Sequence, residues 1–120
     1  MIIIESLDHI NIPTTNLEKS IEFYTMFLDF ELVSNTENEE AIISFDDVLM
    51  VKLSPSEESS IISSYPVLSF ILDVDDFTEG LQEIETGDIK IISGPDEIKN
   101  GESMVIADPS GNAIELYYKE

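Results

Sequence analysis

The chain has 120 residues, and its composition excludes several classes of protein. It carries 26 Asp or Glu residues against 5 Lys or Arg, for a formal net charge of −21, and it contains no cysteine. The lack of cysteine excludes disulfides, thiolate zinc sites and a thiol nucleophile. Nucleic acids and anionic membrane surfaces are bound through Lys and Arg, so neither is an expected partner.

Length and hydropathy predict one folded domain that stays out of the membrane. A hydrophobic fraction of 42% is enough to build a core in a chain of this size. The opening segment, MIIIESLDH, lacks the basic region and the long apolar run of a secretory signal, and no apolar run has the length of a membrane span. We therefore expect a soluble, cytoplasmic protein.

The first half of the chain reads as a strand, a helix and three more strands. Residues 3–12 alternate in polarity, and Pro13 ends this first strand. Asn16 is the expected N-cap of an amphipathic helix that ends near Leu28. Three short strand-like runs follow, at residues 30–35, 40–45 and 48–53.

The second half repeats this order after a Ser-rich connection. Residues 66–74 read as a strand, and Asp76 is the expected N-cap of the next helix. Loop and turn segments, GPDEIKNG and DPSG, separate the three strands expected after it, at residues 88–93, 102–107 and 112–118.

The two halves align with each other at offsets of about 60 to 63 residues, which indicates an internal repeat. We expect a single domain, 1–120, made of module 1 (1–54) and module 2 (65–120) joined by a linker (55–64). Each βαβββ module is too small to bury both faces of its sheet. The predicted fold class is therefore α+β, with two βαβββ modules forming a curved mixed sheet around a cleft, and this cleft is the expected ligand site.

Several acidic residues are explained by turns rather than by chemistry. Asp46 and Asp47 lie at the turn that corresponds to Asp108 in the second half, so turn formation accounts for them. Gly111 is expected to adopt a positive φ angle there. The run DVDD at residues 73–76 lacks the glycine and the distal glutamate of a calcium loop and is rejected as one.

Two long motifs carry a family resemblance. The segment LDHINIPTTNLEKSIEFYTMFLDFEL near the start and DPSGNAIELYY near the end, with paired βαβββ modules between them, resemble the vicinal oxygen chelate superfamily. That superfamily includes glyoxalase I, extradiol dioxygenases, methylmalonyl-CoA epimerase and the fosfomycin and bleomycin resistance proteins. The resemblance covers essentially the whole chain and implies a homodimer, because the bleomycin resistance proteins are small, acidic dimers.

The resemblance also implies where a metal would be held. In metal-dependent members, four inward side chains, from the first and last strand of each module, bind a divalent ion. The corresponding positions here are His9, Lys52, Ser69 and Glu115, and we expect these four side chains to line the ligand pocket. A charged lysine repels a metal ion, so we expect no metal cofactor and expect Lys52 to pair with Glu115. If a metal is bound, its ligands are His9 and Glu115; alternatively, His9 is a strand histidine that bonds a neighbouring residue.

Three functions remain open at this point. The leading hypothesis is a metal-independent small-molecule binding protein of the glyoxalase and bleomycin resistance type, which sequesters a cationic ligand or an antibiotic. The acidic charge favours a cationic ligand, although it is also explained by solubility or adaptation to high salt. The alternative is a divergent glyoxalase-like lyase or isomerase, or a dioxygenase, with an incomplete metal site. A third hypothesis is a structural or regulatory partner whose cleft is filled by its own side chains.

Overall fold

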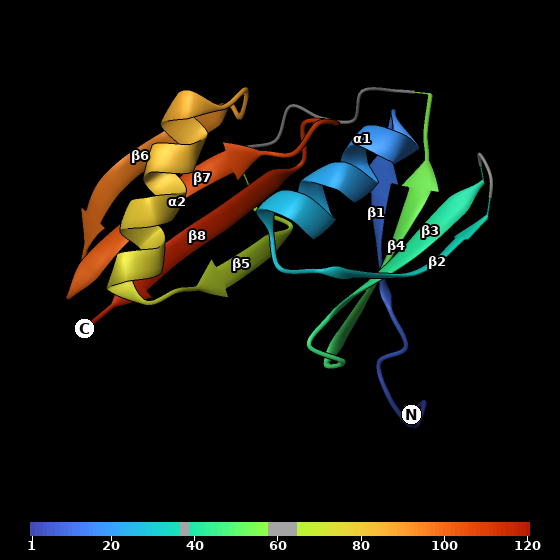
Figure 1. Cartoon of the computed structure of the whole chain (residues 1–120). Helices are drawn as coiled ribbons and strands as arrows, with labels where there is room; N and C mark the ends of the chain where they lie inside the picture. The colour runs from blue at the N-terminus through green and yellow to red at the C-terminus, as the bar shows by residue number, and fades with distance from the viewer. Residues whose placement is uncertain (37–38, 58–64) are drawn as a thin grey trace. The chain divides into compact units, whose positions relative to one another are not determined.

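The computed structural model describes residues 1–36, 39–57 and 65–120 and contains two compact units, Met1–Ser59 and Ser60–Glu120. Each unit has its own four-stranded sheet and is described by itself (Figure 1). Most of the predicted linker, residues 58–64, lies outside the described residues. The predicted α+β class and the two modules are confirmed, whereas a shared cleft between the modules stays a prediction.

Unit 1 has the predicted strand–helix–three-strand order. Its sheet has the strand order β1-β4-β3-β2, with β1 parallel to β4 and the other neighbours antiparallel. The elements are β1 (Ile10–Thr14), α1 (Leu17–Glu22), the π-helix η1 (Phe23–Phe27), β2 (Glu31–Thr36), β3 (Glu40–Phe45) and β4 (Leu49–Pro55).

Helix α1 begins where the sequence predicts. The side-chain Oδ1 of Asn16 accepts a hydrogen bond from the backbone N–H of Lys19 at 3.0 Å, so Asn16 is the N-cap. The helix continues as η1 to Phe27, one residue before the predicted end. Tyr24 is fully buried, as are Ile43 on β3 and Val51 on β4, and α1 packs against these two strands. This packing gives the sheet of unit 1 one covered face.

The first strand begins later than predicted. The ladder between β1 and β4 starts at Ile10, opposite Val51, instead of near residue 3. Ile2, Ile3 and Ile4 are 88%, 83% and 78% exposed, and the segment that carries them leads away from the sheet (Figure 1). Residue types predict a strand in this segment, but a strand also needs a neighbour to receive its hydrogen bonds.

Unit 2 repeats the topology of unit 1. Its sheet has the order β5-β8-β7-β6, with β5 parallel to β8 and the other neighbours antiparallel. The elements are β5 (Leu68–Ile71), α2 (Val74–Thr86), β6 (Ile91–Ile98), β7 (Gly101–Ala107) and β8 (Ala113–Lys119).

Two boundaries in unit 2 differ from the prediction. The N-cap of α2 is Asp73, not Asp76, which lies within the first helical turn, where its negative charge suits the helix dipole. Strand β6 continues to Ile98 through residues predicted as a loop, and breaks in its register on both sides of Ser93 accommodate Gly94 and Pro95. Among the described residues, neither helix combines the length and the apolar character that a bilayer crossing requires.

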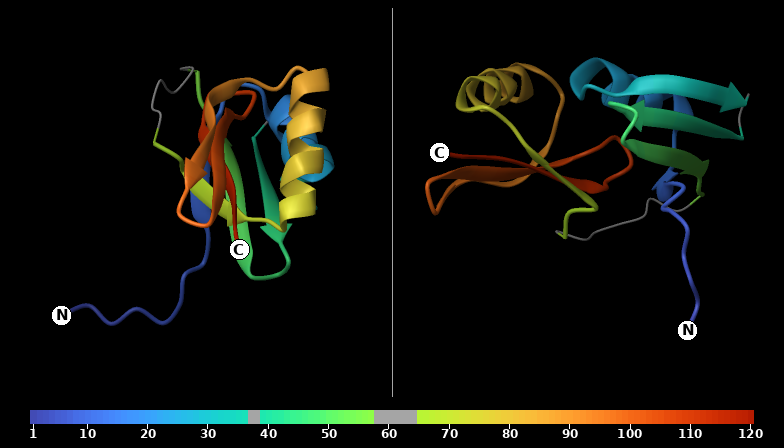
Figure 2. Two further views of the ribbon diagram at one scale, coloured as in Figure 1. Left: turned by 90° about the vertical axis from the view of Figure 1, so that its left-hand side faces the viewer. Right: turned by 90° about the horizontal axis from the view of Figure 1, so that it is seen from below.

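Each sheet has a helix on one face only, as Figure 2 shows for the two units separately. Because side chains alternate between the faces of a strand, the residues next to the buried ones point away from the helix. We call this side of each sheet its helix-distal face. In unit 1 it carries His9, Asn11, Glu40, Ile42, Ser44, Met50 and Lys52; in unit 2 it carries Ser69, Ser103, Val105, Glu115 and Tyr117.

The predicted turns are confirmed. Asp46 and Asp47 have φ angles of 49° and 56°, and the N–H of Val48 donates to the carbonyl oxygen of Phe45 at 2.9 Å. In the second half, Gly111 has the expected positive φ, 91°. Both acidic turns therefore serve the chain reversal between two strands.

The carboxylate of Asp108 organises the second turn. It is 4% exposed, and its Oδ1 accepts from the backbone N–H groups of Ser110 at 2.9 Å and Asn112 at 2.8 Å. Its Oδ2 accepts from the side-chain Nδ2 of Asn112 at 2.9 Å. These bonds hold the loop from which β8 begins, so Asp108 helps to fix the position of Glu115.

Asp108→Ala should lower the free energy of unfolding by about 3 kcal/mol, because buried donors lose their acceptor. Asp88→Ala removes an acid from an exposed turn and should change it by less than about 0.5 kcal/mol. Urea unfolding followed by circular dichroism measures both values. Equal values for the two variants would contradict the structural role of Asp108.

Tyr118 on β8 connects α2 to the sheet. Its ring lies 5.1 Å from that of Phe77, and its hydroxyl donates to Glu102 Oε2 at 3.1 Å. Partial burial raises the pKa of Tyr118 above its ordinary value of 10.0, and the hydrogen bond to Glu102 and the negative charges of Glu102, Glu120 and Glu97 raise this pKa further. The tyrosine is therefore held in its neutral form.

Glu102→Gln should lower the pKa of Tyr118 towards its ordinary value. In the wild type, the stabilisation linked to this group is complete below pH 10 and is lost as the pH rises through the higher pKa of the folded chain. Titration of tyrosinate absorbance, with Tyr118→Phe subtracted, measures the pKa. An unchanged pKa in Glu102→Gln would show that Glu102 does not contribute to it.

Candidate functional site

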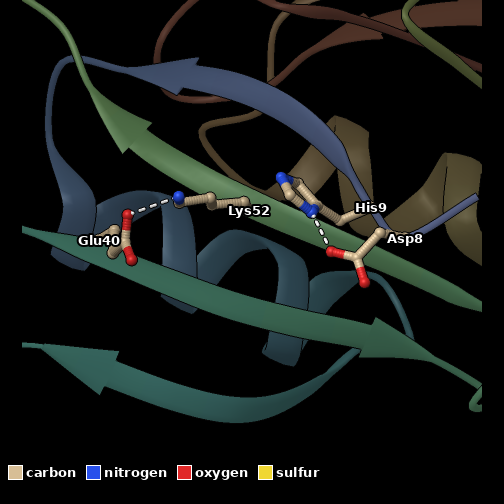
Figure 3. Close-up of polar contacts among 4 residues, drawn as sticks. All are labelled: Asp8, His9, Glu40 and Lys52. Carbon is tan, nitrogen blue, oxygen red and sulfur yellow. Dashed lines mark hydrogen bonds and ion pairs between the residues drawn. The ribbon is translucent and has the colours of Figure 1, made fainter.

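His9 is held by its neighbour in the chain. Its Nδ1 donates to Asp8 Oδ2 at 2.6 Å, and its side chain is 32% exposed (Figure 3). This bond to a neighbouring residue agrees with the alternative prediction, although His9 lies one residue before β1 rather than within a strand. The same bond is the usual arrangement of a metal-binding histidine, because a carboxylate on Nδ1 leaves the electron pair of Nε2 available to a metal ion.

Lys52 pairs within its own sheet, which corrects the predicted pairing with Glu115. Its Nζ lies 3.0 Å from Glu40 Oε2 (Figure 3). Ile42 of β3 lies opposite Lys52, and Glu40 is two residues further along the same face. This diagonal spacing suits a long side chain, so the nearest carboxylate takes the lysine. The charge of Lys52 is therefore balanced inside unit 1.

Glu115 is oriented by a serine that the sequence analysis missed. Ser103 Oγ donates to Glu115 Oε2 at 3.0 Å from the adjacent strand β7. Val105 lies opposite Glu115, which puts Ser103 two residues away on the same face. The pairing of Ala107 with Ala113 at the hairpin end sets this register. If the Ala107–Ala113 pair had been known, the alternation of side chains along residues 102–107 would have placed Ser103 on the same face as Glu115.

The strand register changes which residue of unit 2 corresponds to His9. In unit 1, Asn11 lies opposite Lys52, and in unit 2, Ser69 lies opposite Glu115. Ser69 therefore corresponds to Asn11, and Val67 occupies the position equivalent to His9. The prediction from the helix-based offset is wrong by two residues, because it aligned Asn16 with Asp76, whereas the N-cap of α2 is Asp73.

The side chains at the family's metal positions fit a divalent ion in part. His9 and Glu115 are suitable ligands, and each is oriented by a second side chain. The ammonium of Lys52 is not a ligand, and Val67 offers no donor atom. Within residues 1–36, 39–57 and 65–120, no group of three or more His, Cys, Asp or Glu side chains is arranged to hold a metal.

Curated relatives share most of the chain. Metallothiol transferase FosB of Staphylococcus epidermidis is 29% identical over 116 residues, which cover 95% of this chain and 82% of the relative. Metallothiol transferase FosB of Staphylococcus haemolyticus is 26% identical over 133 residues, which cover 98% of this chain and 93% of the relative. The similarity therefore spans both units.

Solved structures share the fold. The fosfomycin resistance protein FosX from Listeria monocytogenes superposes with a TM-score of 0.82 at 15% identity, covering 98% of this chain and 96% of that one. FosX from Mesorhizobium loti gives a TM-score of 0.78 at 19% identity, covering 98% and 95%. At these identities the likeness concerns the fold alone.

The expectation of a protein without a metal cofactor is corrected by these relatives. A metallothiol transferase is by its name a metal-dependent enzyme, and the relatives with that name match nearly the whole chain. The metal-independent binding hypothesis relied on Lys52 as a repelling charge. That reason fails, because Glu40 neutralises the ammonium.

The family itself is shown by a match along almost the entire sequence. The family model described as the Glyoxalase/Bleomycin resistance protein/Dioxygenase superfamily matches residues 6–116. This range includes all described strands of both units up to the middle of β8. The chain therefore belongs to the Glyoxalase/Bleomycin resistance protein/Dioxygenase superfamily.

Proposed function

We propose that this chain is a metal-dependent enzyme of the fosfomycin resistance type, in which His9 and Glu115 are each a candidate ligand of a divalent ion. The observation that carries this proposal is the similarity to metallothiol transferases over 95% of the chain, with a suitable ligand, His9, one residue before the first strand and another, Glu115, on the last strand. The substrate class is a small molecule with an electrophilic carbon, which accepts a thiol group.

The chain's own residues prepare the two ligands. Asp8 accepts a hydrogen bond from His9 Nδ1, which would leave the electron pair of Nε2 available to bind a metal. Ser103 takes one oxygen of Glu115 in a hydrogen bond and limits the rotation of the carboxylate. When bound, the metal would act as a Lewis acid that polarises a substrate oxygen.

In this proposal, water and substrate supply the remaining ligands of the metal ion. Magnesium and similar hard ions commonly use one or two protein ligands and retain several waters, so two ligands are a workable number. The net charge of −21 raises the local concentration of divalent cations. The cation that the acidic surface attracts is, in this proposal, the metal itself.

We further propose that the protein is a homodimer. His9 and Glu115 belong to separate units, and the pair can be supplied by one chain or by two chains that exchange units. A dimer of either kind contains two identical sites, each with one His9 and one Glu115. Sedimentation equilibrium distinguishes the dimer from a monomer.

Calorimetric titration of Mn²⁺, Mg²⁺, Zn²⁺ and Ni²⁺ into protein purified without chelator tests the metal site. We expect one ion per chain with a Kd below about 1 mM, which is about −4 kcal/mol. Glu115→Gln and His9→Ala should each weaken binding at least about 10-fold. Glu79→Gln removes the same charge from the exposed surface of α2 and is the matched control.

The result that would overturn the metal site is the absence of binding to the wild type, or equal effects of Glu115→Gln and Glu79→Gln. The reaction is tested by mass spectrometry of fosfomycin incubated with a thiol, the protein and the bound metal. A thiol adduct supports the transferase. Turnover of a hemithioacetal or a catechol instead would assign a lyase or a dioxygenase.

Asp8→Asn should raise the metal Kd about 10-fold, because an amide is a weaker partner for His9 Nδ1 than a carboxylate. Asp8 is 94% exposed, so the free energy of unfolding should change by less than about 0.5 kcal/mol. Ser103→Ala should also raise the metal Kd, because it removes the hydrogen bond that orients the Glu115 carboxylate. The same calorimetry measures both variants, and an unchanged Kd in both would remove the positioning role from these residues.

A further inference from the structure

We propose that residues 2–7, which we name the isoleucine segment, pair as an antiparallel strand with the same segment of a second copy of this chain. The inference deepens the proposed homodimer and rests on that part of the proposed function alone, because it involves neither the metal nor the substrate. It identifies the surface by which two copies recognise each other.

The isoleucine segment exposes an unusual amount of apolar surface. Ile2, Ile3 and Ile4 are each more than three-quarters exposed, and the segment leads away from the sheet of unit 1 (Figure 1). Among the described residues, no other run of exposed large hydrophobic residues is longer than two. Contiguous exposed apolar surface marks an interaction site, and β-branched side chains favour a strand. The segment therefore has the composition of a strand that lacks a neighbour.

The edge strands of the two sheets are poor neighbours for this segment. Strand β1 contains Pro13, which has no N–H to donate, and β5 has only 4 residues. Strands β2 and β6 carry register breaks, and such breaks twist an edge away from an added strand. The isoleucine segment of a second copy contains no proline and belongs to no strand of its own sheet. It is therefore the neighbour that fits best.

The position of the charged residue decides how the two segments align. Glu5 is the only charged residue in the sequence of residues 2–7. If Ile3 lies opposite Ile3 of the second copy, Ile2 lies opposite Ile4, and every isoleucine faces an isoleucine. The two Glu5 carboxylates are then four residues apart along the ladder, about 13 Å, which is beyond the Debye length at physiological salt. An alignment centred on Glu5 would place like charges directly opposite each other.

The net charge explains why two copies meet at this segment and why a third does not join them. Each copy carries a net charge of −21, so two copies repel each other over most of their surface. A segment with a single acid is a place where they can approach at low electrostatic cost. The contact is two-fold symmetric and therefore closed, and a third chain of the same sign is repelled by both members of the pair.

Disulfide cross-linking tests the contact, because the chain contains no cysteine and an introduced one has no background. Residues opposite each other in an antiparallel ladder have the Cα separation that a disulfide needs. We expect Ile3→Cys to form a cross-linked dimer at least about 10-fold faster than Val48→Cys. Val48 is the matched control, since it is 82% exposed and Ile3 is 83% exposed, both in unit 1. Equal rates would overturn the proposal.

Sedimentation equilibrium of the full chain tests whether the segment holds the dimer together. Ile3→Lys should weaken the dimer at least about 10-fold, because it sets two ammonium groups opposite each other, whereas Ile3→Val should retain it. Val48→Lys makes the same change of charge at the same exposure and should leave the dimer intact. The wild-type dimer should be tighter at about 1 M salt than at about 0.1 M, because salt screens the repulsion between the two copies.

The possible failures are distinguishable from one another. A dimer that Ile3→Lys and Val48→Lys weaken equally would overturn the role of the isoleucine segment and leave the homodimer with another interface. A wild type that is monomeric at every concentration would contradict both the segment contact and the homodimer. Assemblies that grow beyond two chains would overturn the closed pair. None of these measurements uses metal or turnover, so their failure is separate from failure of the metal-dependent enzyme.

Discussion

The parallel pairing of the first and last strands in each unit determines which side chains can act together. In unit 1 this pairing sets Asn11 opposite Lys52, and in unit 2 it sets Ser69 opposite Glu115. A shift of one residue in either ladder would turn all of these side chains into the helix-covered core. The buried residues on the other face make that shift costly, because apolar side chains such as Val51 would then leave the core.

Local signals account for the parts of the fold that could be predicted. The cap at Asn16 and the positive φ of Gly111 are confirmed because each depends on residues within a few positions. The boundaries that were wrong depend on distant neighbours. The strand at Ile10 begins where β4 offers a partner, and β6 continues past Gly94 because register breaks accommodate an irregular backbone. A single sequence contains no direct signal for either.

The same distinction between local and distant signals applies to the candidate site. His9 and Glu115 could be found from motifs, because they occupy fixed places in segments of recognisable pattern. The partners of the site residues could not, since they depend on cross-strand diagonals. Glu40 rather than Glu115 takes Lys52, and Ser103 takes Glu115. These pairs depend on which residues of neighbouring strands lie opposite each other. A turn that is longer or shorter by one or two residues would change that pairing.

The pairing of Lys52 also explains why a lysine near a metal ligand is no argument against a metal. The repulsion between an ammonium and a divalent ion is a Coulomb term, and a carboxylate at 3.0 Å from the ammonium cancels most of it beyond the pair itself. The ion pair therefore repels a divalent cation only weakly, so the presence of Lys52 is compatible with a metal ion bound by His9.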